Sequence, residues 1–81
     1  MQLDETVCRG SLIIHCGISY AVVSERPESY SKGMVSFRGW AILPTADIAS
    51  GVIAERIHVS ENEEVNMFFP GVAFAIPDYI K

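Results

Sequence analysis

The feature that most constrains the fold of this chain is the interval of residues 10–24, which carries no formal charge. Within it, residues 12–23 read LIIHCGISYAVV, with apolar residues at every even position and mixed residues at the odd positions. A period of two is typical of a β-strand with one buried face, so the even positions are predicted to face a core. Gly17 indicates a bend or bulge in this stretch, which leaves open whether it forms one bent strand or two.

The length of 81 residues predicts a single domain, residues 1–81. Of these residues 49% are hydrophobic and only 20% are charged. A fold this small has too much surface for its volume to hide all of that apolar area. We therefore expect self-association, as a homodimer or a higher oligomer, or binding to another protein.

The charge balance, ten acidic against six basic residues, gives a net charge of -4. Nucleic-acid binding is unfavoured, because it needs clustered lysine and arginine, and this chain has only two lysines and no basic run. An acidic chain suits a partner protein with a basic surface. No signal peptide or membrane span is predicted, since Asp4 and Glu5 occupy the position of a basic leader and the uncharged interval is too short. We expect a cytoplasmic protein with free thiols and no membrane partner.

Further strands are predicted by alternating apolar residues at 34–43, 52–59, 65–69 and 72–76, with a weaker edge strand at 1–9. The acidic residues 60–64 lie between two of these segments and predict a hairpin with a five-residue loop. Pro70 and Gly71 fit the centre of a type II turn. Residues 24–33 are rich in serine and charge and are predicted to form a loop with Tyr30 at its centre.

The segment of residues 45–59 is ambiguous between helix and strand. Its β-branched density and Gly51 favour a helical turn over residues 45–50, capped by Thr45, followed by a strand over 52–59 with Ile53 facing inward. A helix over residues 45–56 is the alternative.

The predicted fold is therefore mainly β, with five or six short antiparallel strands in a small barrel or compact sandwich and one helical turn. The alternative is an α+β fold with a helix near 45–56. In the predicted strand of residues 34–43, Arg38 and Trp40 lie two residues apart and so share one side of the strand. Their side chains are within reach of stacking on each other.

The leading functional hypothesis is a non-enzymatic protein–protein interaction module. On this hypothesis the protein self-associates, or it binds and inhibits a larger protein. A nucleic-acid-handling enzyme with a basic groove is one example of such a target. The analogy to small phage-type inhibitors is one of size and charge alone. The predicted protein-binding residues are Tyr30, Arg38, Trp40, Glu61, Glu63 and Glu64.

Two alternatives come from other functional classes. A single-stranded nucleic-acid binder would stack bases on the aromatic residues Tyr30, Phe37, Trp40, Phe68 and Phe69. A small enzyme or metal protein would use Cys8, His15, Cys16 or His58. Adjacent residues of a strand point to opposite faces, so His15 and Cys16 are poorly placed to share an ion or act as a dyad. We therefore predict no cofactor, no metal and no catalytic residue.

Overall fold

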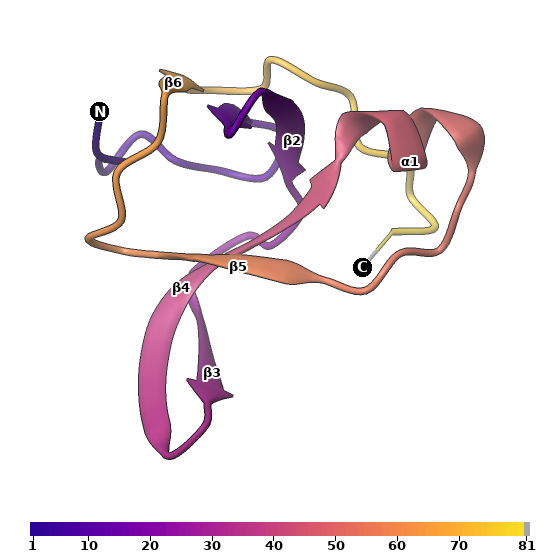
Figure 1. Cartoon of the computed structure of the whole chain (residues 1–81). Coiled ribbons are helices and arrows are strands. Elements are labelled where there is room, and N and C mark those ends of the chain that lie inside the picture. The colour runs from indigo at the N-terminus through magenta and orange to yellow at the C-terminus, as the bar shows by residue number, and fades with distance from the viewer. Residues whose placement is uncertain (81) are drawn as a thin grey trace.

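The computed structural model describes residues 1–80 and consists of six strands and one short helix (Figure 1). Within this range no helix is long and apolar enough to span a membrane. The elements, in chain order, are β1 (Leu12–His15), β2 (Ile18–Val22), β3 (Glu28–Lys32), β4 (Val35–Pro44), α1 (Thr45–Ser50), β5 (Ile57–Ser60) and β6 (Met67–Phe69). The mainly β prediction with one helical turn is thus confirmed.

The strands form one antiparallel sheet in the order β3-β4-β2-β1-β6, and β5 pairs with β4 outside this path. The long strand β4 organises the sheet, because it pairs with β3 through residues 35–39, with β5 through residues 39–42 and with β2 through residues 42–44. The strands at the two ends of the path, β3 and β6, do not pair with each other among the described residues, so the sheet is not closed into a barrel.

The uncharged interval forms two strands, a hairpin whose turn places Cys16 and Gly17 at φ 53° and 75°. Two residues of positive φ match the twist of the paired strands. The hairpin register pairs Ile13 with Tyr20, so an odd position of β1 shares a face with an even position of β2. The prediction that all even positions are buried is therefore wrong: Cys16 and Ile18 are exposed, whereas Ile13 is fully buried.

Two apolar clusters occupy the two faces of the sheet, because successive residues of β4 alternate between them. The first cluster includes Ile13, Val22, Ile42 and Val59, with Trp40 packed partly buried at its margin. The second is covered by α1, whose Ile48 packs on residues such as Ala41 and Leu43.

The helix α1 occupies the predicted residues, and the alternative of a helix over 45–56 is wrong. Gly51 adopts the left-handed conformation (φ 75°) and ends the helix by donating its N–H to the last turn. Thr45 lies inside the helix rather than capping it, and its hydroxyl donates to the Ser19 carbonyl at 3.4 Å. The following strand begins only at Ile57, and Ile53, predicted to face inward, is 96% exposed.

Two predicted connections differ from the structure. The predicted loop at residues 24–33 contains strand β3, because its polar residues pair with β4 over five positions. The predicted hairpin around residues 60–64 does not form, since β5 pairs with β4 and β6 pairs with β1. The acidic segment instead runs between two parts of the sheet, and Val65 next to it donates its N–H to the Met1 carbonyl.

The two ends of the described chain carry less regular structure than predicted. Residues 1–9 contribute only an isolated bridge between Gln2 and Glu64. Residues 72–76 form no strand, because their backbone turns to the Gly10 carbonyl, which accepts the N–H groups of Ala73 and Phe74. The predicted turn position of Gly71 is consistent with its φ of 76°. The predicted tail residue Lys81 lies outside the described residues.

Candidate functional site

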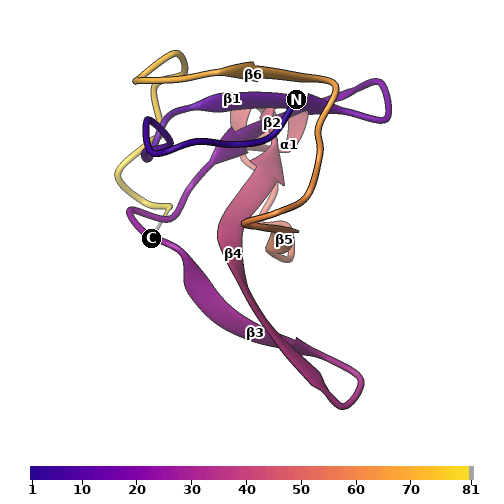
Figure 2. The same ribbon diagram turned by 90° about the vertical axis from the view of Figure 1, so that its left-hand side faces the viewer.

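The hairpin of β3 and β4 projects away from the rest of the chain, as two perpendicular views show (Figures 1 and 2). We call residues 28–38 the arm. All eight residues from 31 to 38 are exposed. Gly33 adopts a φ of 64° at the turn, and the side chain beside it, Met34, is 103% exposed, so none of residues 1–80 covers the end of the arm. An apolar side chain presented in this way is a feature of contact surfaces.

One face of the arm is aromatic. Tyr30 lies opposite Phe37 in the β3–β4 register, and the two rings stack with centroids 5.7 Å apart. The Tyr30 ring also stacks on the imidazole of His58 in β5, at 4.4 Å and an interplanar angle of 20°. The arm is therefore fastened to β5 by ring contacts near its base.

Gly39 of β4 makes this arrangement possible. A Cβ placed on Gly39 would lie 2.2 Å from the carbonyl oxygen of Val59, which is far inside van der Waals contact. Because glycine has no side chain, the backbone of β5 can cross close to β4 at this point. This approach brings His58 to Tyr30.

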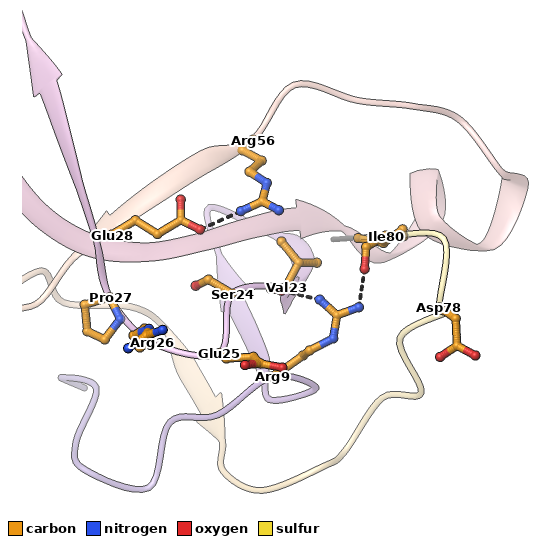
Figure 3. A pocket seen from close by; sticks show the side chains of 10 residues that line it. All are labelled: Arg9, Val23, Ser24, Glu25, Arg26, Pro27, Glu28, Arg56, Asp78 and Ile80. Atoms are coloured by element: carbon orange, nitrogen blue, oxygen red, sulfur yellow. Dashed lines mark hydrogen bonds and ion pairs between the residues drawn. The ribbon is translucent and has the colours of Figure 1, made fainter.

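The base of the arm is fixed by a charged cluster. One carboxylate oxygen of Glu28, the first residue of β3, lies 2.6 Å from the guanidinium of Arg56, and the other lies 3.3 Å from Nε2 of His58. Figure 3 shows the Glu28–Arg56 pair. These partners are 28 and 30 residues away in the chain. Sequence reasoning missed Glu28 and Arg56, because no local pattern marks a pair of that separation.

The opposite face of the arm carries Arg38. Its guanidinium lies 3.3 Å from the carboxylate of Glu61, and both side chains are about half exposed or more. The predicted neighbour Trp40 lies two residues closer to the body, where it packs against the first apolar cluster. The sequence prediction placed Arg38 and Trp40 on one side, and the structure directs the Arg38 charge to Glu61.

Of the two remaining predicted acids, Glu63 lies near the base of the arm and Glu64 does not. Glu63 lies 3.7 Å from His15. Partial burial raises the pKa of Tyr30, and the negative charge of Glu63 raises that pKa further. Glu64 is exposed and pairs with Gln2 through the backbone. The structure thus brings Tyr30, Arg38, Glu61 and Glu63 into one region, whereas Trp40 belongs to the core margin and Glu64 to the N-terminal contact.

A cleft of about 500 Å³ opens beside the base of the arm (Figure 3). Arg9 enters it and donates to the backbone carbonyls of Val23 and Ile80. Arg56 is held by Glu28, and Arg26 lies exposed at the rim. Two of the three arginines of the cleft are therefore engaged by the protein itself. The full lining is Arg9, Val23, Ser24, Glu25, Arg26, Pro27, Glu28, Arg56, Asp78 and Ile80.

The residues considered for metal binding or nucleophilic chemistry lie in separate places. His15 faces Glu63 and His58 faces Glu28, while the free thiol of Cys16 is exposed in the β1–β2 turn. The free thiol of Cys8 lies 3.7 Å from the Ser11 hydroxyl. Within residues 1–80, no three histidine, cysteine, aspartate or glutamate side chains are grouped so that they could hold a metal ion.

No protein-family model matches this sequence, and neither the curated proteins nor the solved structures include a significant match to it.

Proposed function

We propose that this protein is a non-enzymatic interaction module whose arm enters an apolar pocket on a larger protein, a pocket bordered by basic side chains. The observation that carries the proposal is the run of eight exposed residues at the end of the arm. Its apolar members are Met34, Val35 and Phe37, which are 103%, 56% and 38% exposed. Transferring such side chains from water into a pocket releases about 25 cal/mol for each Å² of apolar surface buried.

The anchoring of the arm supports a binding role. Glu28, Arg56 and the Tyr30–His58 stack fix the base of the arm, so its end is presented without a large loss of backbone freedom on binding. The contacts of Glu28 suit an anchor, because Arg56 and His58 hold its two carboxylate oxygens from β5 and the segment before it.

The charge next to the arm supports a basic border on the partner. Glu61 and Glu63 lie beside the arm, and the chain has a net charge of -4. Complementary charge around an apolar contact speeds association and fixes orientation. A protein that handles nucleic acid presents a surface of this type, and occupation of that surface by the arm would inhibit it by competition.

Site-specific photo-crosslinking tests the proposal. A photoreactive residue at position 34 should give a discrete adduct with a second protein in the native cells. The matched control is position 53, where Ile53 is equally exposed but lies away from the arm. A discrete adduct from position 34 alone supports the proposal, and its absence, or identical adducts from both positions, contradicts it.

The captured partner then tests the charge argument. The triple variant E61K/E63K/E64K should weaken binding to the purified partner by about tenfold or more. The control variant D47K/E55K/D78K makes the same change in net charge at acids in α1, before β5 and in the C-terminal segment, and should weaken binding far less. Equal loss in both variants would show that only the total charge matters, which contradicts a specific basic border.

A further inference from the structure

The outer edge of β3 is the second unusual property of the arm. β3 is the last strand of the sheet path, and within the described part of the chain only β4 pairs with it. In both views the arm stands clear of the other described segments (Figures 1 and 2). An uncovered edge strand offers a row of backbone hydrogen-bonding groups to another chain.

We propose that the partner at this edge is a second copy of the chain, and that the two β3 strands pair antiparallel about Tyr30. The proposal goes beyond the proposed function, because it uses the backbone edge of β3 rather than the side chains at the end of the arm. The two proposals can therefore fail separately.

The hydrogen-bond phase of the arm fixes which backbone groups are available. The Arg38 carbonyl accepts the N–H of Glu61, outside the arm, so the pair Ser29–Arg38 is not hydrogen-bonded within it. Pairs alternate along an antiparallel ladder, and Ser31–Ser36 is accordingly of the same kind. The N–H and C=O groups of Ser29 and Ser31 therefore point outward from β3.

Pairing about Tyr30 satisfies all of these groups. It places Ser29 of one copy opposite Ser31 of the other, twice by symmetry, which forms four backbone hydrogen bonds. If the register were shifted by one residue, the outward N–H and C=O groups of one β3 strand would lie opposite residues of the other β3 strand whose groups point inward to β4. Pro27 precedes β3 and has no N–H, so the ladder ends there.

The side chains of β3 favour the same register. The strand reads ESYSK, and antiparallel pairing about its centre sets Glu28 of each copy opposite Lys32 of the other. Parallel pairing would instead place like charges together. Tyr30 meets its own copy across the two-fold axis, next to Phe37, so one face of the joined arms carries four aromatic rings.

Proline variants test the edge directly. Ser31→Pro removes an outward N–H of β3 without removing a backbone hydrogen bond of the arm, and the residue before it is already extended. The 3.4 Å contact between the Ser31 and Ser36 hydroxyls is lost in this variant and in Ser36→Pro alike. Ser36→Pro makes the same change directly across the arm, on β4, and is the matched control. The oligomeric mass is measured by light scattering over a dilution series from about 1 μM to about 1 mM, with circular dichroism to confirm folding.

The expected result is that the wild type and Ser36→Pro approach twice the chain mass of 8.9 kDa at high concentration, while Ser31→Pro stays at the mass of one chain. A wild type that remains monomeric throughout the series overturns the proposal. So does a dimer that Ser31→Pro and Ser36→Pro weaken equally.

Lys32 provides a second test that leaves the fold intact, because its side chain is exposed. Lys32→Gln removes the attraction to Glu28 of the other copy, and Lys32→Glu replaces it with repulsion. The dimer dissociation constant should rise in that order, by about tenfold or more for Lys32→Glu. Equal dissociation constants for all three proteins would rule out the register about Tyr30.

Discussion

The ring of Tyr30 lies on the imidazole of His58, with centroids 4.4 Å apart, although the two residues belong to strands on different sides of β4. The contact is possible because Gly39 leaves the surface of β4 open between them. It joins the arm to β5 and stands next to the Glu28–Arg56 ion pair. The orientation of the arm therefore depends on these few contacts near its base.

Removing the imidazole should weaken this attachment. His58→Ala is expected to lower the free energy of unfolding by about 1 kcal/mol, because it removes the ring contact and one partner of Glu28. Urea denaturation measures the change. His15→Ala is the control, since its side chain is 35% exposed and makes no ring contact of this type, and it should change the stability by less than about 0.5 kcal/mol. Equal effects would contradict an anchoring role for His58.

The raised pKa of Tyr30 predicts a loss of stability at alkaline pH. Its pKa in the folded protein lies above the ordinary value of 10.0, so the unfolded chain releases this proton first as the pH rises. The stabilisation is complete below about pH 10 and is lost as the pH rises through the folded pKa. Denaturant midpoints across this range should fall less steeply for Tyr30→Phe than for the wild type.

Two controls separate Tyr30 from the other tyrosines and test the part played by Glu63. Tyr79→Phe should keep the wild-type dependence on pH, because Tyr79 is 61% exposed. Glu63→Gln should lower the pKa of Tyr30 partway towards its ordinary value, which near-ultraviolet absorbance of the tyrosinate detects. An unchanged Tyr30 titration in Glu63→Gln would contradict the electrostatic contribution.

Gly39 should not tolerate even alanine. The new methyl group would lie 2.2 Å from the Val59 carbonyl oxygen, so Gly39→Ala must push β5 away from β4. We expect a loss of about 3 kcal/mol in the free energy of unfolding, measured by thermal or urea denaturation. Gly33→Ala is the comparison, because no heavy atom lies within 4 Å of a Cβ at this position. The backbone strain of an alanine at φ 64° should cost only about 1–2 kcal/mol. A larger loss of stability in Gly33→Ala than in Gly39→Ala would contradict this prediction, because it would show that β5 can move away from β4 at little cost.

Arg9 should hold the C-terminal segment against the sheet. Its guanidinium donates to the carbonyls of Val23 and Ile80, which ties the C-terminal segment to the residue that follows β2. Arg9→Ala is expected to speed amide hydrogen exchange and proteolytic cleavage at residues 77–80 while the β1–β2 hairpin stays protected. Arg26→Ala removes an exposed arginine of the same cleft and should leave exchange unchanged. Unchanged exchange in Arg9→Ala would mean that other contacts hold the segment.

Parts of the candidate site were accessible from sequence and parts were not. Tyr30 was predicted because its amphipathic ring lies in a polar segment expected to be exposed. Arg38 was predicted because it lies two residues from Trp40 on the same side of a predicted strand. The anchoring role of Glu28, Arg56 and His58 was not predicted, and His58 was named only as a metal or catalytic candidate. These three residues meet only when β3 and β5 come together on β4. Met34 was placed in a strand, and its complete exposure follows from the turn that Gly33 makes.

Local sequence is enough to specify the mainly β class, the strand of residues 34–43 and the helical turn of residues 45–50, because side-chain alternation and Gly51 act over a few neighbouring residues. Strand pairing was decided only in the tertiary structure. The segment 57–60 could pair with the strand next in the chain or with β4, and local pattern does not distinguish these partners. Packing on both faces of β4 does, since Val59 is buried in the first cluster only when β5 lies beside β4. Strand pairing also decided the position of β3, which pairs with β4 and lies at the edge of the sheet, with the arm in solvent.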